Sequence, residues 1–188
     1  MKGIVFNLLE EVVRREHGED TWDGLLEAAG LAGAYTSVGS YHEEELLRLV
    51  AAASSALGIP PDEVVRWFGR KAMPLLAGKY PAFFGPHRTT RSFLLTLNGV
   101  IHTEVRKLYS GADVPVFDFD TTSAEVLGVT YVSRRKLCAL AEGLILGAAD
   151  HFREEVAFEH TRCLKRGDPC CAWRLAFRRA ESSVARAA

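Results

Sequence analysis

Apolar residues recur at three- to four-residue spacing through the first part of the chain, a period that matches one face of an α-helix. Asp20 or Thr21 is the expected N-cap of the second helix, because either side chain can accept a hydrogen bond from a free backbone donor. Pro74 should kink or break the fourth helix, since proline lacks a backbone N–H. The predicted helices span residues 3–15, 20–30, 42–58, 59–78 and 90–109.

From residue 115 the pattern changes to alternation, which is the period of a half-buried strand. Phe117 and Phe119, for example, alternate with Val116, Asp118 and Asp120. The two patterns together predict an α+β fold, in which a helical N-terminal part precedes about four antiparallel strands packed on long helices. The predicted strands are 115–120, 124–133, 155–167 and 168–179, with a helix at 134–152, a hairpin turn at 165–168 and a frayed tail at 181–188.

Composition narrows the classes of protein. A chain of 188 residues with 48% apolar residues suits one domain or two closely joined subdomains. The net charge of −1 provides no positive field for nucleic acid or for an anionic membrane surface. Glu10 and Glu11 interrupt the first apolar run, which is untypical of a signal peptide or a membrane span. We therefore expect a cytoplasmic protein. The sequence contains no nucleophile-elbow, phosphate-loop or kinase motif, so we expect that the protein is not an enzyme.

One histidine and one spaced triplet are candidates for ligand binding. His102 lies on the apolar face of the predicted helix, where an unpaired imidazole would cost free energy. It is either a core histidine bonded to a carbonyl or a ligand of a metal or haem. Tyr131, Ser133 and Arg135 occupy alternate positions, so a strand would point all three the same way. Two hydroxyls and a guanidinium suit a pair of carboxylates, but a solvated strand end would carry the same residues.

The cysteines form a second constellation with another histidine. Cys138, His160, Cys163 and either Cys170 or Cys171 would supply three thiols and an imidazole, the ligand set of a closed structural zinc site. Their close spacing is untypical of a secreted disulfide scaffold. The alternative is that the cysteines bind no metal and that the histidine is exposed.

Combined, these features resemble the H-NOX family, the haem nitric oxide/oxygen binding domains of bacterial sensors and of soluble guanylate cyclase. The resemblance rests on a histidine in a long helix after "LNGV", a proline soon after that helix, and Y-x-S-x-R further on. The opening "MKGIVFNLL", the segment "HGEDTW" and "GLILG" after the motif extend it over nearly the whole chain. The histidine and Y-x-S-x-R in this order are more specific than either feature alone.

The resemblance implies haem b as cofactor. His102 would be the axial ligand of the iron, and Tyr131, Ser133 and Arg135 would hold the haem propionates. Pro115 would press on the porphyrin and distort it. These roles would explain both the histidine and the row of donors.

The resemblance also implies how the chain is organised. Residues 1–188 would form one domain, with a distal helical subdomain at about 1–62 and a proximal subdomain with the sheet at about 63–180. Haem would lie between the two.

The distal face of the haem would then select the gas. Family members that hold oxygen stably place a tyrosine in the helix after the motif, where this chain has Leu140. Val5, Leu9 and Ala72 are the other residues expected in the distal pocket, so no donor for dioxygen is expected there. The expected ligands are NO and CO at five-coordinate ferrous iron.

A subset of bacterial members carries zinc, and these match this chain best when Cys171 rather than Cys170 is the fourth ligand. The resemblance therefore implies structural Zn²⁺ on Cys138, His160, Cys163 and Cys171. It also implies that a separate histidine kinase or diguanylate cyclase reads the NO signal. Two rival functions are a thiol and zinc redox sensor, and a haem-free small-molecule binding module similar to vinyl-reductase-type domains.

Overall fold

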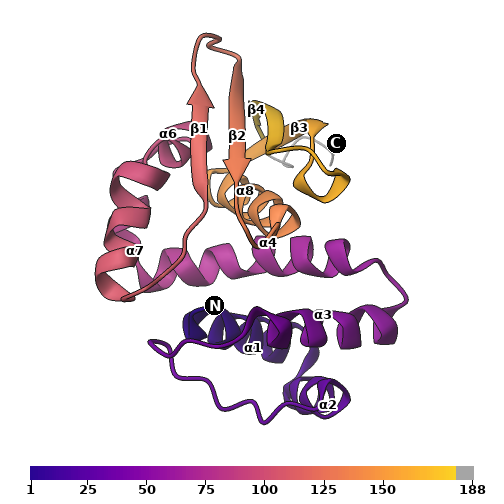
Figure 1. Cartoon of the computed structure of the whole chain (residues 1–188). Helices are drawn as coiled ribbons and strands as arrows, with labels where there is room; N and C mark the ends of the chain where they lie inside the picture. The colour runs from indigo at the N-terminus through magenta and orange to yellow at the C-terminus, as the bar shows by residue number, and fades with distance from the viewer. Residues whose placement is uncertain (181–188) are drawn as a thin grey trace, which may run out of the picture.

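A computed structural model describes residues 1–180, and the predicted tail at 181–188 lies outside the described residues. The α-helices are α1 (Gly3–His17), α2 (Glu19–Ala29), α3 (Glu43–Leu57), α4 (Pro61–Lys79), α5 (Pro81–Phe84), α6 (Thr90–Leu94), α7 (His102–Leu108) and α8 (Cys138–Phe152). The strands are β1 (Val116–Asp120), β2 (Val126–Val132), β3 (Glu154–Arg162) and β4 (Cys171–Arg179). Figure 1 shows α1, α2 and α3 on one side of α4, with α8 and the sheet on the other. The predicted α+β fold is confirmed.

The N-terminal helices follow the predicted amphipathic pattern, with shifts at their ends. α2 and α3 end at Gly30 and Gly58, whose left-handed backbone favours glycine. The predicted cap at Asp20 or Thr21 is wrong, because α2 already begins at Glu19 and no side chain of the described residues caps it. Acidic residues in the first turn favour this start, since they lie at the positive end of the helix dipole.

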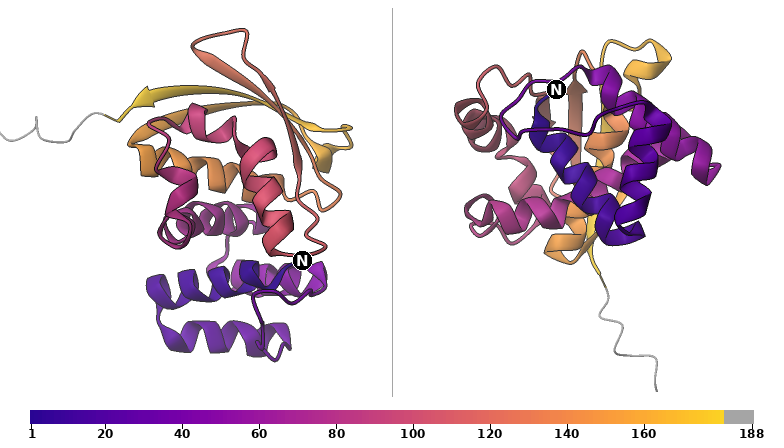
Figure 2. Two further views of the ribbon diagram at one scale, coloured as in Figure 1. Left: turned by 90° about the vertical axis from the view of Figure 1, so that its left-hand side faces the viewer. Right: turned by 90° about the horizontal axis from the view of Figure 1, so that it is seen from below.

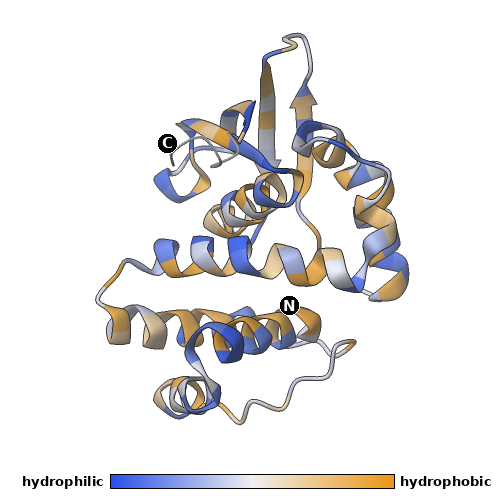
Figure 3. Cartoon of the chain, turned by 180° about the vertical axis from the view of Figure 1, so that it is seen from behind, coloured by the Kyte–Doolittle hydropathy of each residue, from blue (hydrophilic) through white to orange (hydrophobic). Residues whose placement is uncertain are grey.

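α4 crosses the middle of the molecule and changes character along its length. Figure 3 shows several hydrophilic turns in its first half and mostly hydrophobic turns in its second half. Two ion pairs fasten the first half to α8, one between Arg66 and Glu142 (2.8 Å) and one between Arg70 and Asp150 (2.6 Å). Buried residues lie along both halves, from Val64 to Leu75.

Of the two outcomes predicted at Pro74, a kink or a break, the break does not occur, because α4 continues to Lys79. Proline cannot donate a hydrogen bond to the carbonyl of Arg70, four residues earlier. That carbonyl packs against α8, where a Cβ added to Gly147 would lie 2.5 Å from it. The contact with α8 supports the helix where its own hydrogen bond is missing.

The predicted single helix at 90–109 is wrong as well. α6 is separated from α7 by a π-helical turn, η1 (Leu97–Ile101), in which the N–H of His102 bonds to the carbonyl of Leu97. The side chain of Asn98 exchanges two hydrogen bonds with the backbone of Phe117 in β1. This tie to the sheet draws the turn out of α-helical register.

The strands form one antiparallel sheet in the order β1-β2-β4-β3, and α8 lies along one of its faces (Figure 2). In β2, Tyr131 pairs with Phe117 of β1 on one side and with Cys171 of β4 on the other. The predicted pairing of β3 with β4 is confirmed, but the connection is wider than a tight hairpin. It contains a 3-10 turn, η2 (Leu164–Arg166), followed by Gly167.

α4 contributes to two apolar cores. One core joins it to α1, α2 and α3, and includes Leu75. The other joins it to α8 and the sheet, and includes Met73. Within the described residues, no helix has both the length and the apolar character needed to cross a membrane.

The backbones of α4 and α8 approach too closely for side chains at their crossing. A Cβ added to Gly143 would lie 2.1 Å from the carbonyl oxygen of Arg66. One added to Gly69 would lie 2.6 Å from the carbonyl oxygen of Leu140. Glycine is required at both positions, because any other residue would push the helices apart.

Replacing Gly143 with Ala should therefore destabilise the fold. We expect a loss of about 1–3 kcal/mol in the free energy of unfolding, the usual cost of overpacking. Gly78→Ala in α4 is the matched control, because nothing lies within 4 Å of a Cβ at that position. Alanine at 78 should instead stabilise the helix by about 0.5–1 kcal/mol. Denaturant unfolding compares the two variants, and equal stabilities would contradict the close contact.

Candidate functional site

A cavity of about 380 Å³ lies between the two cores. Its walls are mainly apolar side chains from α1, α4, α8 and the segment that includes η1 and α7. Cofactor and small-molecule sites in proteins usually have volumes of about 300–1,000 Å³. Eight of the residues proposed from the sequence line it: Val5, Ala72, His102, Pro115, Tyr131, Ser133, Arg135 and Leu140.

His102 is the first residue of α7 and lies directly after the π-helical turn. Burial, and to a lesser extent the charge of Arg106, lower the pKa of its ring to about 4, against a smaller opposing effect of the Pro115 backbone. Nδ1 is buried and has no hydrogen-bond partner among the described residues. A neutral imidazole with an unused nitrogen is a good metal ligand.

Tyr131, Ser133 and Arg135 line the same cavity, but strand alternation is not the reason. β2 ends at Val132, so the serine and the arginine belong to the turn that follows. In that turn Lys136 has a left-handed backbone (φ 51°), and α8 begins after it, later than predicted. The turn, rather than the strand, brings the three side chains together.

The guanidinium of Arg135 is shared between two carboxylates. Its Nη1 lies 3.1 Å from Oδ2 of Asp113 and donates to the Asp113 carbonyl (2.6 Å). Its Nε lies 3.1 Å from Oε2 of Glu43, without hydrogen-bond geometry. Burial raises the pKa of Tyr131 to about 12 and Ser133 opposes this increase, so the phenol remains a proton donor. These donors can bind the carboxylates of a ligand.

The distal residues come from three helices. Val5, Ala72 and Leu140 line the cavity from α1, α4 and α8. Leu9 does not line it and packs in the N-terminal core instead, so its assignment to the distal pocket is wrong. Leu8 takes its place, because one step along a helix rotates a side chain by about 100°. All four cavity-lining side chains are apolar.

These residues fit a haem. The walls are apolar, one imidazole nitrogen is unused, and the guanidinium with its two neighbouring hydroxyls can bind carboxylates. Haem iron is commonly held by a histidine on one side. A ligand without a metal or carboxylates would use neither the imidazole of His102 nor the guanidinium of Arg135.

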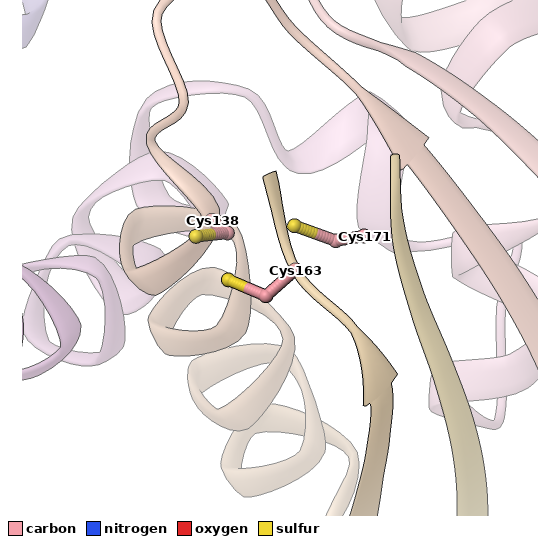
Figure 4. Close-up of side chains that lie close together, drawn as sticks. All are labelled: Cys138, Cys163 and Cys171. Carbon is pink, nitrogen blue, oxygen red and sulfur yellow. The ribbon is translucent and has the colours of Figure 1, made fainter. Parts of the chain in front are cut away.

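Three of the cysteines meet near the start of α8. The sulfur atoms of Cys138, Cys163 and Cys171 lie within 4.8 Å of one another, and Figure 4 shows the three side chains converging. Burial raises the pKa of the Cys138 thiol, and it raises the pKa of the Cys171 thiol to about 12. Cys170 is partly exposed and outside the cluster, since neighbouring residues at a strand point in opposite directions.

His160, in β3, is not part of this cluster. Its Nδ1 is 3.3 Å from Oε1 of Glu142, and its Nε2 is buried with no partner in the described chain. Glu142 is buried and accepts two hydrogen bonds from Arg66 (2.9 and 2.8 Å). Zinc-bound histidines commonly have a carboxylate partner of this kind on their other ring nitrogen.

Sequence reasoning did not identify several residues of the site. Tyr80 and Tyr109 both line the cavity, and their hydroxyl oxygens are 2.7 Å apart. Asp113 and Glu43 contact Arg135, and Glu142 contacts His160. All of these contacts join separate elements, so local spacing contains no signal for them.

Comparisons with known proteins agree with this geometry. The profile of the haem-NO-binding family matches residues 2–160. An H-NOX protein from S. oneidensis, in the Fe(II)NO ligation state, is 32% identical over 95% of this chain and 99% of its own, with a TM-score of 0.88. The H-NOX domain from Shewanella oneidensis in the Fe(II)CO ligation state gives the same identity and coverage, with a TM-score of 0.86.

A more distant structure supports the fold alone. The Fe(II) unliganded H-NOX protein from K. algicida is 23% identical over 97% of this chain and 99% of its own, with a TM-score of 0.84. None of the curated proteins compared matches the sequence. The fold and the family profile define a haem-based gas sensor domain. The chain belongs to the H-NOX family, as its sequence predicted.

Proposed function

We propose that this chain binds haem b in the cavity and senses NO, and CO in vitro, at five-coordinate ferrous iron. One observation carries the proposal: Nδ1 of His102 is buried without a hydrogen-bond partner among the described residues, in an apolar cavity that also contains Arg135. Iron would give the imidazole a partner, and the propionates would give one to Nε of the guanidinium, which donates no hydrogen bond to the described residues.

Each cavity residue then has a role. His102 would hold the iron from the proximal side, and Tyr131, Ser133 and Arg135 would bind the propionates. Pro115 lines the same cavity, and its rigid ring would press on the porphyrin.

The ferrous iron of haem supplies the site at which a diatomic gas binds, and the chain supplies its surroundings. The apolar side chains of Val5, Leu8, Ala72 and Leu140 would face that site. Stable oxygen binding needs a hydrogen-bond donor there, whereas NO and CO need none. The Fe(II)NO and Fe(II)CO states of the S. oneidensis relatives support these two ligands.

NO would release His102, and α7 would then move. Residues 1–62 would shift relative to 63–180, and a separate protein would detect the change. A histidine kinase or a diguanylate cyclase in the cytoplasm is the proposed partner. The chain itself would not be an enzyme, in keeping with a family of sensors.

Absorption spectra of the haem-reconstituted protein test the iron ligand. The wild type should show a sharp Soret band that shifts on adding NO or CO. In His102→Gly the spectrum should depend on added imidazole, because the free base can occupy the space of the missing side chain. His42→Gly, which changes a histidine that is 91% exposed, is the control and should match the wild type.

The same spectra separate the rival functions. A wild-type spectrum from His102→Gly without imidazole would contradict the assignment of the iron ligand. Protein that stays colourless after reconstitution would favour the haem-free binding module. Colourless protein that contains zinc would favour the thiol and zinc redox sensor.

Leu140→Tyr tests the selection of the gas. The new hydroxyl would lie in the cavity and could donate a hydrogen bond, so ferrous protein in aerated buffer should acquire an oxygen-dependent spectrum that the wild type lacks. Leu140→Phe is the matched control, since it adds the ring without the hydroxyl. Stable oxygen binding by the wild type, or equal spectra of the two variants, would contradict the proposed distal pocket.

The cysteine cluster is proposed to bind structural Zn²⁺, which places this chain in the zinc-bearing subset. Cys138, Cys163 and Cys171 would supply three thiolates. His160 would be the fourth ligand through Nε2, which is buried and unused. The contact of its Nδ1 with Glu142 supports this role, because it fixes the ring from the other side.

Zinc analysis of purified protein tests this assignment. The wild type should contain about one zinc per chain, as expected for a single tetrahedral site. Cys138→Ala, Cys163→Ala and Cys171→Ala should each lose the metal, because a closed site needs every ligand. Cys170→Ala is the matched control and should retain it. Absence of zinc from the wild type, or loss only in Cys170→Ala, would overturn the site.

A further inference from the structure

The segment that carries His102 is held by few packing contacts. Across 97–108, all of which the structure describes, no residue is fully buried. Val100 is 49% exposed although it is apolar, and the cavity is lined by Leu97, Ile101, Val105 and Leu108. An element with so little buried surface opens easily unless other contacts restrain it.

Two hydrogen-bonded contacts join this segment to distant parts of the described chain, one near each end. Asn98 bonds to the backbone of Phe117 in β1. Tyr109, directly after α7, bonds through its hydroxyl to the hydroxyl of Tyr80, directly after α4 (2.7 Å). Burial raises the pKa of Tyr109 to about 12, so its hydroxyl keeps its proton.

The two contacts have different consequences for α7. The contact at Asn98 precedes His102 and ties the π-helical turn to the sheet. The contact at Tyr109 follows α7 and ties its far end to α4, which belongs to both apolar cores. Both tyrosine rings line the cavity itself. A displacement of α7 away from α4 therefore has to separate the two hydroxyls.

We propose that the bond between Tyr80 and Tyr109 is a brace that positions α7, and His102 with it, and that it breaks when α7 moves. The proposal rests on the proposed function, because that motion follows the release of His102 from iron. Neither tyrosine needs to touch the gas for this. They are positioning residues that act through the helix between His102 and Tyr109.

Tyr109→Phe removes one hydroxyl and keeps the ring, so it tests the bond and little else. In ferrous haem-loaded protein, amide hydrogen exchange in α7 should become about 2- to 10-fold faster, the effect of one net hydrogen bond. The loss of the His102 ligand after mixing with NO, followed by stopped-flow absorption, should accelerate by a similar factor. Tyr80→Phe should have the same effects, and the double variant should add nothing further.

Tyr35→Phe is the matched control. It also removes a tyrosine hydroxyl bond, to Glu45 (3.1 Å), but one that joins the loop before α3 to α3 itself. It should leave exchange in α7 and the NO reaction unchanged, even if it lowers the melting temperature. Exchange in α7 and NO kinetics that are unchanged in both Tyr80→Phe and Tyr109→Phe would overturn the brace.

Failure of the brace can be distinguished from failure of the proposed function. Wild-type protein that binds no haem, or that keeps His102 on the iron after NO, counts against the proposed function. In that case exchange in haem-free protein still decides the inference. Faster exchange in α7 of the two tyrosine variants supports the brace, and exchange equal to that of Tyr35→Phe overturns it.

Discussion

The close contact between the backbones of α4 and α8 is the constraint on which the rest of the structure depends. At Gly69 and Gly143 there is no room for a single added carbon, so the distance between the helices is fixed by main-chain atoms. Side chains can change rotamer to relieve a poor contact, whereas two backbones in contact cannot. The positions of Ala72 on one helix and Leu140 on the other follow directly, and with them two walls of the cavity.

The start of α8 then links two sites that are chemically unrelated. Arg135 belongs to the cavity, Cys138 belongs to the thiol cluster, and Leu140 belongs to the cavity again. Whatever fixes the cysteine at the first turn of the helix also fixes the residues on either side of it. The turn before α8 contains Lys136 in a left-handed conformation. The two sites therefore lie within a few residues of each other along the backbone.

The sequence predicted most of the fold, because apolar spacing is a local property and most helices and strands obey it. The N-terminal helices, the alternation around Phe117 and the pairing of β3 with β4 were all visible in this way. The division of 90–109 was not, since it depends on a bond from Asn98 to the sheet. The continuity of α4 through Pro74 depends likewise on support from α8.

In the candidate site, too, the sequence predicted local features but not the contacts between separate elements. The resemblance to zinc-bearing family members favoured Cys171 over Cys170, and Cys171 is the one that lies in the thiol cluster. An error of one helical position placed Leu9 in the cavity instead of Leu8, because a sequence does not show how a helix is rotated about its axis. The contact between His160 and Glu142 joins a strand to a helix, and no spacing rule could have predicted it. Chemistry-bearing residues were thus easier to identify than their partners.

The π-helical turn at Leu97–Ile101 determines how α7, the helix that follows, is rotated about its own axis. Its hydrogen bonds close over five residues instead of four, so the turn holds one more residue than an α-helical path would. Converting it to α-helix would rotate His102 about the axis by about 100° relative to the preceding residues. It would also slide the ring by about 1.5 Å along the axis. The π-helical turn therefore sets the direction in which the imidazole of His102 points. If the turn became α-helical, the imidazole would point toward a different neighbour.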